Sequence, residues 1–158
     1  MGILWVTNHI NPAQEHLATN IIRQKIILGI EKLTPLLNYG KRIVLFLPEG
    51  EYHELGILYV HFLLKQKGIY VDYLGANVPL VDLKYLTEVK KIDYLYSHIT
   101  SPARSFKLDK FFTNLATIKS DIPIILSGQL IQDFKGKIAS NIHLKRSLAE
   151  TISFLQEI

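Results

Sequence analysis

Short apolar runs alternate with helical patterns from residue 41 onward, and this alternation constrains the fold more than any other feature of the chain. Five runs are typical of strands buried on both faces: residues 41–47, 69–74, 92–96, 122–126 and, more weakly, 141–144. Four segments carry apolar residues at helical spacing: 53–67, 80–89, 105–118 and 147–156. Strand and helix therefore follow one another about five times.

This order predicts an α/β fold, a flavodoxin-like or Rossmann-like parallel sheet of five strands with helices on both faces. In such sheets, ligands bind outside the carboxyl ends of the strands. The loops that follow the strands are therefore where we expect a functional site.

Residues 1–40 do not follow the repeat. Asn11 is placed as a helix N-cap, Pro12 as the first helical residue, and Gln14 can bond back to the cap. The helix should run to about Leu33 with a broad apolar stripe formed by Leu17, Ile21, Ile22, Ile26, Leu28 and Leu33. One such helix and a helical stub at residues 1–6 cannot close a helical layer. We therefore expect residues 1–40 to be part of a truncated helix-bundle cap, with further helices upstream, and residues 41–158 to form the sheet domain.

Composition excludes several classes of protein. The chain has 158 residues, of which 48% are hydrophobic and 20% charged, so it is not expected to be disordered. The absence of cysteine excludes disulfides, thiolate zinc sites, iron–sulfur clusters and a cysteine nucleophile. No apolar run is long enough for a membrane span and no signal peptide is present, which predicts a cytoplasmic protein without a membrane partner. The net charge of +4 comes from scattered basic pairs, which favours solvated element ends over a DNA-binding face.

A carboxylate and a histidine follow the first predicted strand in the segment Glu51-Tyr52-His53-Glu54-Leu55-Gly56. A carboxylate two residues before a histidine can accept the Nδ1 proton, which leaves Nε2 free to ligate a metal. Gly56 would keep the turn into the helix free of a side chain where a bulky planar ligand approaches. The alternative is a surface histidine bonded only to Glu51 or to water.

Three segments together resemble the cobalamin-binding Rossmann-like domain, whose pattern is Asp-x-His-x-x-Gly, then Ser-x-Leu, then Gly-Gly. The matching segments here are Glu51 to Gly56, Ser97-His98-Ile99-Thr100 and Ser127-Gly128. The resemblance implies that His53 displaces cobalamin's dimethylbenzimidazole and ligates cobalt from below. It also implies that Ser97, Thr100, Ser127 and Gly128 line the slot for the nucleotide tail. Glu51, Ile99 and Ser127 depart from the family pattern, and Ser127 narrows the slot.

A second pattern, Trp5 followed after nine residues by Glu15-His16, resembles the cap of MerR-class light-sensing repressors that bind adenosylcobalamin. The resemblance implies that Trp5 packs beside the adenosyl group and that Glu15 and His16 contact it. The alternative is that Trp5 packs in the core of a helix bundle and that Glu15 is an acidic residue in the first turn of a helix, where the helix dipole favours it. Val6 stands where the best-understood members carry an upper histidine ligand, so a bis-histidine photoproduct from that position is not expected; His9 is a weaker candidate for that role.

These observations support three functions. The first is the sensory domain of a transcriptional regulator that binds adenosylcobalamin, responds to light or cobalamin, and forms a homo-oligomer. In that case DNA would be bound only by an N-terminal domain absent from this chain. This function implies no catalysis. The second is a corrinoid-carrying subunit of a methyltransferase or mutase. The third is a flavodoxin-like interaction module without a cofactor. No Gly-x-Ser-x-Gly elbow or phosphate-binding loop is present, which argues against a hydrolase or a nucleotide enzyme.

Overall fold

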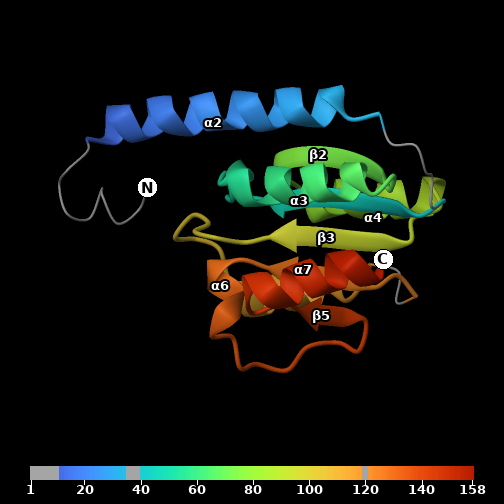
Figure 1. Cartoon of the computed structure of the whole chain (residues 1–158). Helices are drawn as coiled ribbons and strands as arrows, with labels where there is room; N and C mark the ends of the chain where they lie inside the picture. Colours follow the sequence, from blue (N-terminus) through green and yellow to red (C-terminus); the bar gives the residue numbers. More distant parts are fainter. Residues whose placement is uncertain (1–10, 35–39, 119–120) are drawn as a thin grey trace.

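A computed structural model describes residues 11–34, 40–118 and 121–158 (Figure 1). The strands are β1 Arg42–Pro48, β2 Tyr70–Val78, β3 Tyr94–His98, β4 Ile124–Ser127 and β5 Ile142–Leu144. The helices are α2 Pro12–Lys32, α3 Glu54–Gln66, α4 Leu80–Val89, α5 Leu108–Leu115, α6 Gln129–Gln132 and α7 Leu148–Glu157. Trp5, Val6, His9 and the helical stub expected at 1–6 lie outside the described residues.

The five strands form one parallel sheet in the order β2-β1-β3-β4-β5, so the predicted fold class is confirmed. The chain winds outward from β1 in one direction to β2 and in the other to β3, β4 and β5. The loops that leave β1 and β3 therefore diverge over the carboxyl edge of the sheet. This is the topological switch point at which α/β proteins bind their ligands.

Each face of the sheet carries its own apolar core. Strand β1 supplies both: Ile43, Leu45 and Leu47 pack on one face with α3 and α7, whereas Val44 and Phe46 pack on the other with α4 and α5. All five side chains are buried. Because both faces of β1 are covered, its sequence is a continuous apolar run rather than an alternating one.

Element boundaries differ from the predicted ones where local geometry overrides the pattern. Strand β2 continues past Gly75 to Val78, because the positive φ values of Gly75 and Asn77 produce irregular pairing with β1 instead of a turn. Helix α5 starts later than expected, after a turn in which Phe106 N–H donates to the Ala103 carbonyl at 2.8 Å. Strand β3 extends through His98, and the short helix α6 was not predicted.

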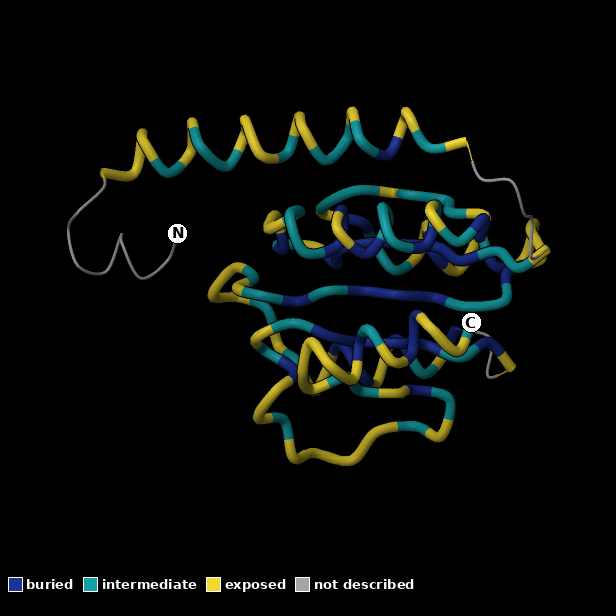
Figure 2. Tube along the Cα trace, viewed as in Figure 1, coloured by how far each residue is buried: buried dark blue, intermediate teal, exposed yellow. Residues whose placement is uncertain are grey.

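Helix α2 begins as its sequence predicts, with a reciprocal capping box between Asn11 and Gln14. It packs against α3 rather than on the sheet (Figures 1 and 2). Ile30 is its only buried residue. Four of the six residues of its predicted apolar stripe are exposed, with Leu17 64% and Leu28 48% exposed, whereas Ile26 and Leu33 are half-buried. None of the described helices is long and apolar enough to cross a membrane.

Candidate functional site

The carboxylate of Glu51 organises the loop after β1. Its Oε1 accepts hydrogen bonds from the backbone N–H groups of Tyr52 and His53, both at 2.9 Å, and lies 2.6 Å from His53 Nδ1. Its Oε2 accepts from the N–H groups of Thr100 at 2.7 Å and Ser101 at 2.8 Å. Burial disfavours the charged form of this fully buried carboxyl, but the hydrogen bonds outweigh burial and lower its pKa. Glu51 is thus an ionised group that holds the β1 and β3 loops together.

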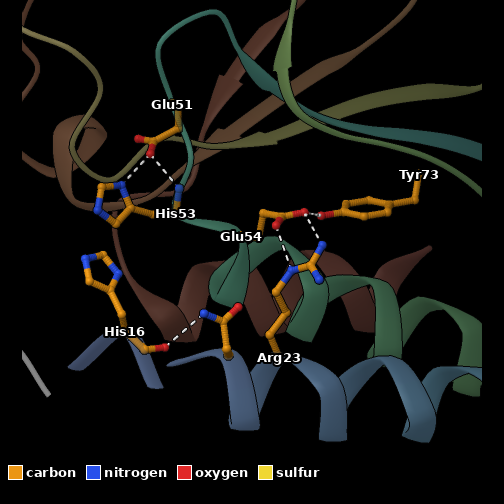
Figure 3. Close-up of polar contacts among 7 residues, drawn as sticks. His16, Arg23, Glu51, His53, Glu54 and Tyr73 are labelled. Atoms are coloured by element: carbon orange, nitrogen blue, oxygen red, sulfur yellow. Dashed lines mark hydrogen bonds and ion pairs between the residues drawn. The ribbon is translucent and has the colours of Figure 1, made fainter. Parts of the chain in front are cut away.

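His53 is the residue before the first turn of α3, and its side chain is 57% exposed. The predicted bond between its Nδ1 and Glu51 is confirmed (Figure 3). With Nδ1 donating to a carboxylate, Nε2 carries a lone pair that faces away from Glu51 and suits a metal. Within the described ranges, no three His, Cys, Asp or Glu side chains gather to hold a metal ion. A metal at His53 would therefore have to bring most of its own ligands with it.

A cavity of about 300 Å³ lies beside this loop, between α3 and α7. Four of the residues predicted to form the site line it: Gly56, Thr100, Ser127 and Gly128. Tyr59, Tyr96 and His98 also line the cavity, and sequence reasoning assigned them no role. The volume is at the lower end of the range for small-molecule sites.

Ser127 joins Tyr96 and His98 in a chain of hydrogen bonds at the cavity wall. Its Oγ lies 2.6 Å from the hydroxyl of Tyr96 and 2.9 Å from Nδ1 of His98. Burial raises the pKa of Tyr96 to about 12 and lowers the pKa of His98, so both groups are neutral near pH 7. Ser127 stands where the family pattern has glycine, and its hydroxyl group has two hydrogen-bond partners, Tyr96 and His98.

Gly56 makes room for a neighbouring side chain of the protein. A Cβ at this position would collide with the imidazole of His98, so the close approach that the glycine permits is to a side chain of the protein itself. Gly128 is required as well, because its φ is +105° and a Cβ there would collide with the backbone of Ile99. Both glycines thus shape the cavity wall.

Ser97 is not among the residues that line this cavity. Its side chain is fully buried in β3, and its Oγ has no hydrogen-bond partner in the described part of the chain. A buried hydroxyl without a partner is uncommon in folded proteins.

Helix α2 brings Glu15 and His16 to the same end of the molecule. Glu15 is half-buried and His16 is exposed, and Figure 3 shows the His16 side chain extending from α2 toward the loop that carries His53. Trp5, predicted to act with them, lies outside the described residues. Of the three predicted cap residues, His16 is the one whose side chain the structure directs toward the His53 loop.

An ion pair fixes α2 against the site. The guanidinium Nε of Arg23 lies 2.7 Å from Glu54 Oε2, and the hydroxyl of Tyr73 donates to Glu54 Oε1 at 2.6 Å (Figure 3). Burial opposes ionisation of Glu54, but Arg23 and Tyr73 outweigh it and lower the pKa of the carboxyl. Sequence reasoning missed this group because Arg23 and Glu54 are far apart along the chain and neither forms a local motif.

Comparisons with known proteins agree with this geometry. No protein-family model matches the chain. The chain is 40% identical over 72 residues to the HTH-type transcriptional repressor CarA of Myxococcus xanthus, a match that covers 46% of this chain and 25% of that protein. It is 31% identical over 83 residues to the HTH-type transcriptional repressor CarH of the same organism, covering 52% of this chain and 27% of that protein. The matched part is about a quarter of the length of either relative.

Among solved structures, the chain resembles a cobalamin-binding protein from Desulfitobacterium hafniense DCB-2. The TM-score is 0.52 at 16% sequence identity, and the alignment covers 99% of this chain and 75% of that one. At this identity the likeness concerns the fold alone. The chain is therefore a partial homologue of the transcriptional repressors CarA and CarH and has the fold of a cobalamin-binding protein.

Proposed function

We propose that this chain is the cobalamin-binding sensory domain of a transcriptional regulator and that His53 is the lower cobalt ligand. The observation that carries the proposal is the pair formed by Glu51 and His53. Glu51 fixes Nδ1 at 2.6 Å, and the imidazole is left exposed at the switch point of the sheet with Nε2 free. A hydrogen bond from Nδ1 to a carboxylate both orients a metal-binding imidazole and raises its basicity.

The residues present fit cobalamin in three respects. The corrin ring supplies four equatorial nitrogens, so one imidazole is enough and no cluster of protein ligands is needed. The cavity of about 300 Å³ beside His53 offers room for part of a displaced nucleotide tail. Thr100, Ser127 and Gly128 line this cavity and are candidates for contact with that tail.

His53 would hold the cobalt of a bound cobalamin, and the cofactor would supply a light-sensitive bond from cobalt to an upper organic group. Helix α2 would cover that upper group, with Trp5, Glu15 and His16 facing the adenosyl moiety of adenosylcobalamin. The exposed stripe that includes Leu17, Ile21 and Leu28 would pack against further helices of the cap. In this proposal, residues 1–40 form part of the cap and residues 41–158 form the corrinoid-binding domain.

Regulation would follow from differential affinity. A ligand that binds one state of the cap more tightly than another shifts the population toward that state. In the proposed regulator, Trp5, Glu15 and His16 would keep the cap closed over adenosylcobalamin and so favour a homo-oligomer. The cap would open once light or a fall in cobalamin level had removed that contact. DNA would be bound by a separate domain of the regulator. The similarity to two repressors favours this function over a corrinoid-carrying subunit of a methyltransferase or mutase.

The test is reconstitution with adenosylcobalamin in the dark, followed by gel filtration and an absorbance spectrum. We expect the wild-type chain to retain cobalamin and the cobalt-centred band to shift in His53→Ala. His143→Ala, which alters an exposed histidine on β5, is the matched control and should give the wild-type spectrum. Identical spectra for wild type and His53→Ala, or no retained corrinoid in any sample, would refute the proposal.

A further inference from the structure

The cavity between α3 and α7 carries charge of one sign only, and the proposed function does not yet use it. Lys145 and Arg146 line the cavity, and none of the described lining residues is Asp or Glu. Both cations belong to the segment that joins β5 to α7, so they lie at the same wall. A cavity whose formal charges are all positive favours an anionic ligand over a neutral or cationic one.

Arg146 is held in place by backbone carbonyls. Its Nη1 donates to three of them at the end of α6 and just beyond it, those of Ile131 at 3.3 Å, Gln132 at 3.0 Å and Phe134 at 2.7 Å. A guanidinium group has five N–H donors. Nε and Nη2 have no hydrogen-bond partner among the described residues, so the group is fixed at one nitrogen and has donors left at the other two.

No acidic side chain pairs with either cation in the described part of the chain. Glu150 accepts the backbone N–H of Arg146 at 2.9 Å, but no ion pair joins it to the guanidinium. Lys145 is half-buried, and its Nζ lies 5.3 Å from the centroid of the Phe154 ring. A fixed guanidinium with unused donors is well matched to the oxygens of a phosphate group, to which arginine can donate two parallel hydrogen bonds.

We propose that Arg146 binds the phosphodiester group of the corrinoid's nucleotide tail. The inference rests on the proposed function, in which that tail enters this cavity. A phosphodiester is negatively charged and has only acceptor oxygens, so it complements the guanidinium in both charge and hydrogen bonding. Removing the charge of Arg146 should therefore weaken the binding of a corrinoid that has a tail and leave the binding of a tail-less corrinoid unchanged.

The experiment measures the affinities of adenosylcobalamin and of adenosylcobinamide, which lacks the nucleotide tail, by absorbance titration in the dark. The readout is the ratio of the first affinity to the second. Because Arg146 is exposed, its ion pair with the tail should have ordinary surface strength, so Arg146→Gln should lower the ratio about twofold to fivefold. Arg146→Lys keeps the charge and should retain most of the wild-type ratio. Arg104→Gln removes an exposed arginine that does not line this cavity and should leave the ratio unchanged.

Salt separates the charge of Arg146 from its contacts with α6, because glutamine can still donate to carbonyls. Raising sodium chloride from about 50 mM to about 500 mM should lower the wild-type ratio and leave that of Arg146→Gln nearly constant, since salt screens exposed charges. A wild-type ratio that does not change with salt, equal ratios in wild type and Arg146→Gln, or an equal loss in the Gln and Lys variants overturns the role of Arg146. The proposed function still stands in those cases if adenosylcobinamide binds. Failure of both corrinoids to bind the wild-type chain overturns the proposed function and this inference with it.

Discussion

At the scale of single residues, the site depends most on Glu51. It accepts five hydrogen bonds, four from backbone N–H groups and one from the His53 ring, although its side chain is fully buried. A buried carboxylate with this many donors is both a structural and a functional group. Its two oxygens join the loop that carries His53 to the loop that carries Thr100.

We predict that Glu51→Ala destabilises the fold, because it leaves four partly buried backbone N–H groups without their acceptor. Each such group costs about 1–3 kcal/mol, so the free energy of unfolding should fall by at least about 2 kcal/mol in urea denaturation. Glu49→Ala removes an exposed carboxylate from the same loop and should change stability by less than about 0.5 kcal/mol. Equal stability of the two variants would contradict the role given to Glu51.

The bond between Glu51 and His53 could be predicted from sequence, because the two residues are close along the chain and follow a recognisable strand. The bonds from Glu51 to Thr100 and Ser101 could not, since they depend on how β1 and β3 pair in the sheet. The contact between His98 and Gly56 could not be predicted from sequence either, because it depends on how β3 and α3 pack in the fold. Local spacing identifies candidate groups, whereas their partners follow from the tertiary fold.

At the scale of elements, the main connection is between α2 and α3. Glu54, which pairs with Arg23 and Tyr73, is the residue after His53, so the position of α2 is linked directly to the loop of the proposed cobalt ligand. Periodicity predicted the sheet, its order of elements and the helix α2 correctly. It did not predict which side of α2 meets α3, because the most apolar stripe of α2 is the one left in solvent.

We expect Arg23→Gln to loosen α2 without disturbing the sheet. A partly exposed ion pair of this kind contributes about 1 kcal/mol or less, which should appear as faster hydrogen exchange of the α2 amides and unchanged exchange in β1. The matched control is Lys25→Gln, an exposed cation on the same helix. If both variants exchange alike in α2, the pair does not fix the helix.

At the scale of the whole molecule, two half-buried histidines contribute to the response to acid. Burial lowers the pKa of His61 and of His98 from the ordinary value near 6.5. Below that value the unfolded chain binds protons that the folded chain does not, so the contribution is present at neutral pH and is lost as pH falls. Glu51, whose pKa is also lowered, adds a loss at more acidic pH.

The free energy of unfolding should therefore decrease when the pH is lowered from about 7.5 to about 5.5. Urea denaturation at the two pH values measures it. Replacing His61 and His98 by glutamine should reduce the decrease, whereas His143→Gln should leave it as in wild type. A wild-type chain that is equally stable or more stable at the lower pH would contradict this account.

The central claim, that His53 ligates cobalt, is tested most directly by electron paramagnetic resonance of the cobalt(II) form bound to the chain. The axial nitrogen splits the cobalt lines, into three components with ordinary nitrogen and into two with its heavy isotope. We predict that chain grown with heavy-isotope histidine and loaded with unlabelled corrinoid gives two-line splitting, and that this splitting is lost in His53→Ala. Three-line splitting in the labelled chain would show that the corrinoid's own base remains on the metal and would contradict the claim.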